Sequence, residues 1–158
     1  MCIRDSVSAD AKAGRGTPAL VKAANYGHLD ALKLLRKHGA NLEATDPDGW
    51  TALMGAAYFG KADCAEALLE WGADKDAADS ALGYTALHYA ASYGQLEIAR
   101  LLVRARADRA KKNEEGKTAL EFARAEGKAE VAALLEQADA NVRIPPMRGN
   151  CVLVVSYR

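Results

Sequence analysis

The sequence predicts an all-α solenoid of stacked helix pairs, and three observations support this fold class. A stretch that begins at Gly83, GYTALHYAASYG, recurs with substitutions from Gly16, Gly49 and Gly116. These lead glycines stand 33, 34 and 33 residues apart. Apolar residues follow helical spacing within the units, and a glycine separates the two halves of each. Such a period indicates a repeat architecture, in which a unit too small to bury its own apolar face is stabilised by its neighbours.

Each unit is expected to contain two short helices. In the third unit apolar residues recur at i, i+3 and i+4 in both halves, which gives each helix one apolar face. These residues are Leu87, Ala90 and Ala91 in the first half and Ile98, Leu101 and Leu102 in the second.

Glycines and acids mark where the helices end and begin. A glycine between the halves can take the left-handed conformation that ends a helix. These glycines are Gly27, Gly60, Gly94 and Gly127. An acid opens the second helix of every unit, where it complements the helix dipole and is interpreted as structural. These acids are Asp30, Asp63, Glu97 and Glu130.

A glycine turn follows the second helix in the first two units. Gly39-Ala40-Asn41 and Gly72-Ala73-Asp74 should leave the helix and start a hairpin-like loop toward the next unit. Arg106 replaces the glycine in the third unit. A left-handed backbone at Arg106 would carry a strain of about 1 kcal/mol.

The unit resembles the ankyrin repeat, because it combines Gly-x-Thr-Ala-Leu-His-x-Ala-Ala with a closing Gly-Ala-Asp. The resemblance covers Gly16 to Asn141. It implies repeats at 16–48, 49–82, 83–115 and 116–141, stacked into a curved solenoid of antiparallel helix pairs with hairpin-like loops on one side. It also implies binding of other proteins through the loop tips and the concave face of the first helices. Enzymatic activity in such chains belongs to other domains, so no enzyme is expected here.

Both ends of the chain lie outside these units. Residues 1–15 are interpreted as an adapter-derived scar, MCIRDS, followed by a remnant of an upstream repeat. The back-translation of MCIRDS resembles the end of a transposase-type sequencing adapter. The fourth unit has Asp139 in place of the turn glycine, which suits a terminal position. Residues 142–158 are expected to form an unstructured or strand-prone tail, with a decayed fifth repeat as the alternative.

Composition narrows the function classes. Lys plus Arg and Asp plus Glu number 21 each, so the zero formal charge gives no general attraction to nucleic acid or anionic lipid. No apolar run approaches the roughly 18 residues of a membrane span. The cysteines are odd in number and far apart, which favours a reducing compartment. We expect a cytoplasmic monomer, with the nucleus as an alternative location.

His88 attracts attention as a candidate catalytic residue, but its equivalents argue against this role. They are Val21, Met54 and Glu121, so the position accepts apolar, imidazole and acidic side chains. The family resemblance implies instead that His88 bonds to backbone and to Thr85, tying adjacent loops together.

The sequence contains no other pattern typical of catalysis, cofactors or metals. No pair of His or Cys residues has zinc-like spacing, and no phosphate loop or nucleophile elbow is present. Cys64 aligns with Ala31, Ile98 and Val131 and is interpreted as a buried small hydrophobe.

Candidate partner-binding residues are those that vary between units at positions the fold leaves open. They flank the lead glycine or follow the Ala-Ala pair of the first helix. They are Tyr26, Asp48, Trp50, Tyr58, Phe59, Leu82, Tyr84, Ser92 and Tyr93. Aromatic side chains offer large contact area with few rotors to order, so we expect a partner groove centred on the second and third units. The alternative for Tyr26, Phe59 and Tyr93 is that they cover gaps between adjacent repeats.

The loop before Gly83 contains one extra residue, as the spacing of 34 shows, and should push Leu82 or its neighbours outward.

A basic run offers a second candidate surface. It comprises Arg100, Arg104, Arg106, Arg109, Lys111 and Lys112. Because Arg100 and Arg104 are separated by one helical turn, they should line the outer side of the solenoid. A solvated face is the favoured interpretation, and an anionic partner such as a phosphopeptide or nucleic acid is the alternative.

Two functions remain open. One is a protein-binding module that acts as a scaffold or adaptor. The other is a regulatory or targeting segment of a larger enzyme, channel or effector that is truncated here.

Overall fold

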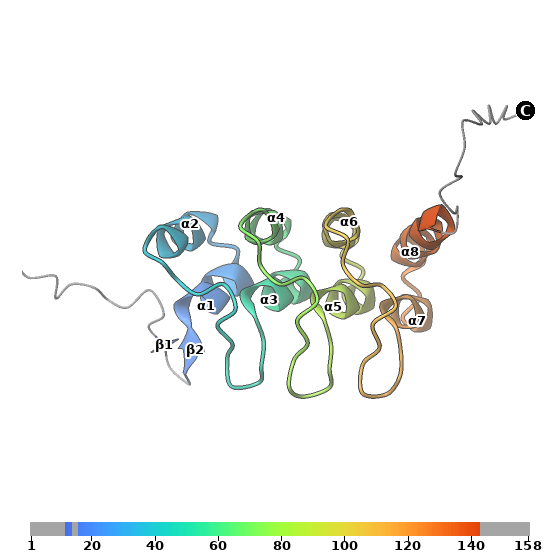
Figure 1. Ribbon diagram of the computed structural model, residues 1–158, viewed down its shortest axis with the longest axis horizontal. Helices are drawn as coiled ribbons and strands as arrows, with labels where there is room; N and C mark the ends of the chain where they lie inside the picture. Colours follow the sequence, from blue (N-terminus) through green and yellow to red (C-terminus); the bar gives the residue numbers. More distant parts are fainter. Residues whose placement is uncertain (1–11, 14–15, 143–158) are drawn as a thin grey trace, which may run out of the picture.

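The computed structural model describes residues 12–13 and 16–142, which contain four stacked helix pairs (Figure 1). The pairs are α1 (Ala19–Tyr26) with α2 (Leu29–Lys37), α3 (Ala52–Phe59) with α4 (Ala62–Glu70), α5 (Ala86–Tyr93) with α6 (Leu96–Arg104), and α7 (Ala119–Ala125) with α8 (Ala129–Val142). We call the first helix of each pair inner and the second outer. Inner helices form one row and outer helices another, and hairpin loops project away from the outer row (Figure 1). The predicted all-α solenoid is confirmed.

A threonine begins three of the inner helices. The side chains of Thr51, Thr85 and Thr118 accept a hydrogen bond from the backbone N–H three residues later. Each satisfies a donor that the helix N-terminus would otherwise leave without a partner. Thr85 and Thr118 take part in full capping boxes. The first unit has Pro18 here and no side-chain cap.

The structure confirms the glycine predicted in the turn after each inner helix and the acid predicted at the start of each outer helix. Gly94 ends α5 at φ 70°, a conformation that disfavours any residue with a Cβ. The equivalent glycines of the other units also have positive φ. The expected acid lies in the first turn of every outer helix.

Alanine allows the inner helices to pack closely. The Ala-Ala pairs at 23–24, 56–57 and 90–91 are buried, and each inner helix packs against the inner helix of the next unit. Leu53 and Leu87, each 1% exposed, fill the space around them. Burying a leucine contributes about 1.5–3 kcal/mol. Cys64 is buried as predicted, and this burial raises the pKa of its thiol.

The hairpins are closed by short antiparallel pairs. β1 (Lys12–Ala13) pairs with β2 (Thr17–Pro18), with Lys12 opposite Pro18. The same register recurs as a single bridge between Lys112 and Thr118. The rest of the segment interpreted as scar and repeat remnant, residues 1–11 and 14–15, lies outside the described residues.

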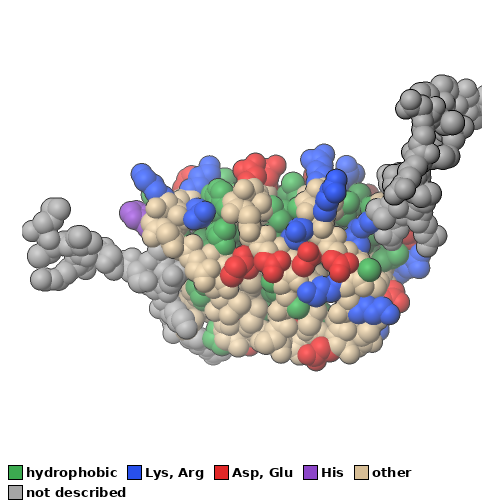
Figure 2. All heavy atoms as spheres, in the orientation of Figure 1, with side chains coloured by type: hydrophobic (Ala, Val, Ile, Leu, Met, Phe, Trp, Pro, Cys, Tyr) green, Lys and Arg blue, Asp and Glu red, His purple; other side chains and the backbone are tan. Residues whose placement is uncertain are grey.

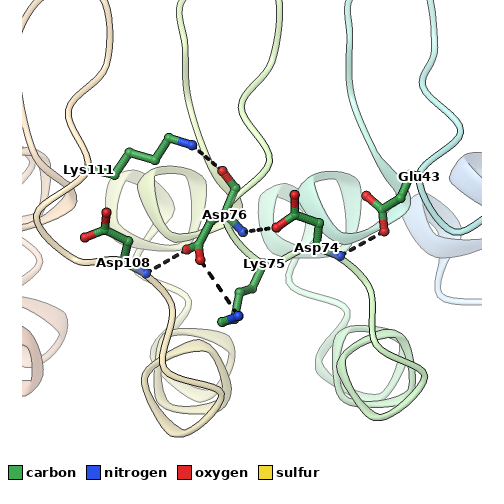
Figure 3. Close-up of polar contacts among 6 residues, drawn as sticks. All are labelled: Glu43, Asp74, Lys75, Asp76, Asp108 and Lys111. Carbon is green, nitrogen blue, oxygen red and sulfur yellow. Dashed lines mark hydrogen bonds and ion pairs between the residues drawn. The ribbon is translucent and has the colours of Figure 1, made fainter.

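A ladder of hydrogen bonds joins the loops that leave the outer helices (Figure 3). Glu43 Oε1 accepts from the backbone N–H of Asp74 at 2.8 Å. One unit further on, Asp76 Oδ1 accepts from the backbone N–H of Asp108 at 2.7 Å. Ala110 occupies the next equivalent position and has no carboxylate to continue the ladder. Successive loops are thereby held in a fixed register.

His88 connects the third unit to the fourth. Thr85 donates to His88 Nδ1 from its backbone N–H at 3.2 Å and from its hydroxyl at 2.9 Å. The ring therefore carries its proton on Nε2, which donates to the carbonyl of Lys117 at 3.2 Å. The imidazole is 0% exposed, and burial lowers the pKa of His88 despite the bond to Lys117. The predicted structural role of His88 is confirmed.

The fourth unit ends differently from the others. α8 continues through Asp139 to Val142, one residue beyond the expected end of the unit, because no turn glycine interrupts it. No helix in the described part of the chain is long and apolar enough to cross a membrane. The remainder of the predicted tail, 143–158, lies outside the described residues.

Arg106 has φ 60°, the left-handed conformation anticipated for it. We expect Arg106→Gly to raise the free energy of unfolding by about 0.5–1 kcal/mol, because relief of strain exceeds the added entropy of the unfolded chain. Ala105→Gly is the matched control: its φ is −71°, so the same glycine should destabilise. Urea denaturation measures both. Equal effects would show that Arg106 carries no strain.

Folding stability should depend on the titration of His88. Because burial lowers its pKa below the unfolded value of about 6.5, the unfolded chain binds the proton more readily. Stability is then full above about pH 6.5 and falls by up to about 1.4 kcal/mol per pH unit below it. His88→Met, which copies Met54 of the preceding unit, should flatten this dependence between about pH 7 and 5.5. His38→Gln, at an exposed position, is the matched control. Urea titrations at the two pH values test this, and an unaltered slope in His88→Met would contradict it.

Candidate partner-binding surface

Seven aromatic side chains of the second, third and fourth units form one continuous set of ring contacts. We call them the aromatic cluster. Its members are Trp50, Tyr58, Phe59, Tyr84, Tyr89, Tyr93 and Phe122. Trp50 and Tyr84 come from hairpins, whereas the other members lie on the inner helices. The cluster therefore brings together residues that flank a lead glycine and residues that follow an Ala-Ala pair, which are the two kinds of position predicted to bind a partner.

Tyr58 is the centre of one half of the cluster. Its ring centroid lies 5.0 Å from that of Trp50, 4.8 Å from Phe59 and 4.3 Å from Tyr93. Trp50 in turn lies 4.8 Å from Tyr89. These tilted and edge-on arrangements suit the ring quadrupoles and add about 0.5–1.5 kcal/mol per pair to the burial of area. The half centred on Tyr58 is thus a packed surface.

Tyr84 links this half to the fourth unit. Its ring centroid lies 5.5 Å from Tyr89 and 5.1 Å from Phe122, both edge-on. The ammonium of Lys117 sits 5.7 Å from the centroid of Phe122 while pairing with Glu115 at 2.9 Å. The cluster is therefore continuous across three units.

Exposure varies systematically within the cluster. Phe59 and Tyr93 are 48% and 49% exposed, although both make ring contacts. Trp50, Tyr58, Tyr84 and Phe122 are half-buried. Tyr89 is buried and forms the floor. The accessible edge thus lies at the C-terminal ends of α3 and α5.

A buried carboxylate supports the floor. Asp79, 5% exposed, accepts a hydrogen bond from the Tyr89 hydroxyl at Oδ2. Its Oδ1 accepts from four consecutive backbone N–H groups of the hairpin tip, residues 81–84, at 2.8–3.4 Å. The extra residue of this hairpin is accommodated here. One side chain therefore fixes both the wide tip and the tyrosine beneath the cluster.

These contacts shift the pKa values of the groups involved. Burial raises the pKa of Asp79, but the hydrogen bonds from Tyr89 and the backbone outweigh it and leave the pKa below its ordinary value. Asp79 is therefore ionised near neutral pH. A hydrogen bond with Tyr58 and burial raise the pKa of Tyr93 to about 12. Burial and the bond to Asp79 also raise the pKa of Tyr89. Tyr89 and Tyr93 thus present neutral hydroxyls near neutral pH.

The family follows from a comparison with known sequence families. The model described as Ankyrin repeats (3 copies) matches residues 3–79 and 74–144. The chain belongs to the ankyrin repeat family. Ankyrin repeats are in general protein–protein interaction modules and are typically non-enzymatic. No curated protein matches this ankyrin chain.

The structure gathers some of the predicted site residues and separates others. Tyr26 is 69% exposed on α1, and its ring stacks on that of His28, at 6.2 Å between centroids, rather than on the cluster. Asp48 is exposed at a hairpin tip, where its N–H donates to Asp46 Oδ1 at 3.0 Å. Leu82 is 44% exposed, as the extra residue predicted. Ser92 is half-buried on α5 between cluster members.

Sequence reasoning missed Tyr89 and Phe122 as members of the surface. They share one position of the inner helix, which is Gly55 in the second ankyrin repeat. A Cβ at Gly55 would lie 1.8 Å from Asn25 Oδ1, so the glycine makes room for a side chain of the first repeat. The available signal was the variability of this position, which runs from glycine to aromatic residues.

The predicted basic surface is only partly exposed. Lys111 donates its Nζ to the carbonyl of Asp76 in the neighbouring repeat (Figure 3). Arg109 is half-buried. Arg100 and Arg104 are exposed on the outer helix α6, as predicted. Figure 2 shows basic side chains over α2, acidic ones over α4 and basic ones over α6, so the outer helices alternate in charge. Two of the six cations of the run, Arg109 and Lys111, are half-buried.

The described part of the chain holds no group of three or more His, Cys, Asp or Glu residues placed to bind a metal ion.

The role of Asp79 in the hairpin can be tested by removing its carboxylate. We expect Asp79→Ala to lower the free energy of unfolding by about 2–4 kcal/mol, because five donors lose their acceptor. Asp46 occupies the position of Asp79 in the preceding hairpin, and it accepts hydrogen bonds from only two N–H groups, those of Asp48 and Trp50. Asp46→Ala should therefore cost about 1 kcal/mol. Chemical denaturation measures both, and equal losses would refute the special role of Asp79.

Proposed function

We propose that this chain is a protein-binding ankyrin module, a scaffold or adaptor, that holds its partner on the aromatic cluster. The observation that supports this function is the half-exposed pair Phe59 and Tyr93, seated on a packed aromatic base. A base of this kind orders the exposed rings before the partner arrives, which reduces the entropy lost on binding. Tyrosine and tryptophan are also the residue types that most often dominate interface energies.

The cluster has two levels that would act differently in binding. Phe59 and Tyr93 offer accessible area, whereas Trp50 and Tyr84 offer only part of their rings. From the sequence, Phe59 and Tyr93 had the alternative role of covering gaps between adjacent repeats, an alternative less favoured for Trp50 and Tyr84. Their exposure favours the opposite order, with Phe59 and Tyr93 as the more accessible pair. We infer that Phe59 and Tyr93 supply the contact area and that Trp50 and Tyr84 position them.

The same surface would serve a regulatory or targeting segment of a larger protein. We further propose a cytoplasmic setting, with the nucleus as the alternative, in which the module is a monomer until it meets its partner. The widely spaced cysteines support this setting.

The test compares two double variants of the full chain. Phe59→Ser with Tyr93→Ser removes the exposed edge of the cluster. Tyr26→Ser with Leu34→Ser removes two side chains that are 69% and 58% exposed in the first repeat. Circular dichroism and urea denaturation confirm that both variants are folded.

Partners are selected from a displayed library of protein fragments with the wild-type chain and then titrated against each variant. We expect the cluster variant to weaken binding by at least about tenfold, or about 1.4 kcal/mol, while the first-repeat variant binds normally. Binders that tolerate the cluster variant as well as the control variant would contradict the proposed surface.

A further inference from the structure

The aromatic cluster lies over a negative charge that forms no ion pair with a cation in the described part of the chain. Asp79 is ionised and buried, and its partners are the Tyr89 hydroxyl and backbone N–H groups. None of the ion pairs found in the described part of the chain involves Asp79. Hydrogen bonds from neutral donors spread this charge without removing it. The field of a carboxylate is also screened less in a protein interior than in water.

Further carboxylates border the cluster. Asp46 accepts from the N–H of Trp50 at 2.9 Å, and the exposed Asp48 lies two residues before Trp50. Glu126, also exposed, acts electrostatically on Tyr93. Within the described residues none of these three acids forms an ion pair. These acids therefore border the cluster on two sides, at the hairpin before Trp50 and at the end of α7 in the fourth repeat.

Two cations near the cluster are already engaged. Lys117 pairs with Glu115, and Arg124 pairs with Glu136 of α8 at 2.8 Å. Lys117 also sits over the face of Phe122, which shows within the molecule how an ammonium is received by these rings. Among the described residues, no Lys or Arg lies over the face of Trp50, Tyr58 or Tyr93 in this way.

We propose that the partner segment held on the aromatic cluster is cationic and carries arginine or lysine next to apolar side chains. Its positive group would lie over the rings between Asp48 and Glu126, and its apolar neighbours would cover Phe59 and Tyr93. Cation–π contacts of this type contribute about 0.5–2 kcal/mol each. With packed helices about 8–10 Å apart, three repeats span roughly 16–20 Å, which an extended segment of five or six residues covers. This inference rests on the proposed function.

The probe is a phage-displayed library of random peptides of about twelve residues, twice the length required. The full chain selects from this library, and the Phe59→Ser, Tyr93→Ser variant identifies the peptides that depend on the cluster. Each such peptide is resynthesised with citrulline for arginine, or norleucine for lysine, which removes the charge and keeps the stem.

Two charge variants complete the design. Asp48→Asn with Glu126→Gln removes two acids at the cluster. Glu66→Gln with Glu70→Gln removes two exposed acids of the outer helix α4 and changes the net charge equally.

We expect cluster-dependent peptides enriched in arginine or lysine, with affinities that fall by at least about tenfold on loss of the peptide charge. Binding should weaken about three- to tenfold in the Asp48, Glu126 variant and not in the α4 variant. Cluster-dependent peptides that are neutral or acidic would overturn the cationic partner and leave the proposed function standing. Peptides that ignore the cluster, or a library without binders, would overturn both.

Discussion

The packing of each inner helix against the next is the interaction on which the rest of this structure depends. Leu53 and Leu87 are buried on inner helices that pack against the inner helices of the neighbouring repeats. Alanine at the helix contacts allows this close approach. Hydrogen bonds then fix how far one repeat can slide on another. Glu43 and Asp76 hold the N–H groups of the following loop, and His88 holds the carbonyl of Lys117. Register is thus set by polar groups and stability by apolar ones, and both kinds of contact run between nearest neighbours only.

This stacking also explains how the aromatic cluster arises. Equivalent positions of successive repeats are brought side by side, so residues more than thirty positions apart, such as Tyr89 and Phe122, share one surface. The position is aromatic in two repeats and glycine in the second, where Asn25 of the first repeat occupies the space. The cluster therefore stops at the boundary between the first and second repeats. Tyr26 remains outside it although it occupies the same helix position as Phe59 and Tyr93.

Most of the fold could be predicted because the same residues recur at equivalent positions of several repeats. Four copies of the same glycine spacing, and three of the threonine, leave few alternatives for helix limits, and they anticipated the left-handed Arg106 and the buried His88. The site was less predictable, since exposure depends on what the neighbouring repeat places opposite each residue. Trp50 and Tyr84 looked like free anchors but pack on Tyr89, which sequence comparison had not selected. The role of Asp79 could not be predicted from the sequence. Aspartate or asparagine stands at the same position in the neighbouring hairpins, where Asp46 and Asn113 make ordinary turn contacts.

Asp79 shows how a local accommodation of the fold can set the chemistry of the surface. A hairpin with one extra residue exposes more backbone N–H groups at its tip than its neighbours do, and these groups require an acceptor. A carboxylate can serve all four, whereas the amide of Asn113 accepts one, from Lys117 at 2.8 Å. The second carboxylate oxygen of Asp79 then needs a donor, and the hydroxyl of Tyr89 provides it. The negative charge beneath the aromatic cluster thus follows from the length of one loop.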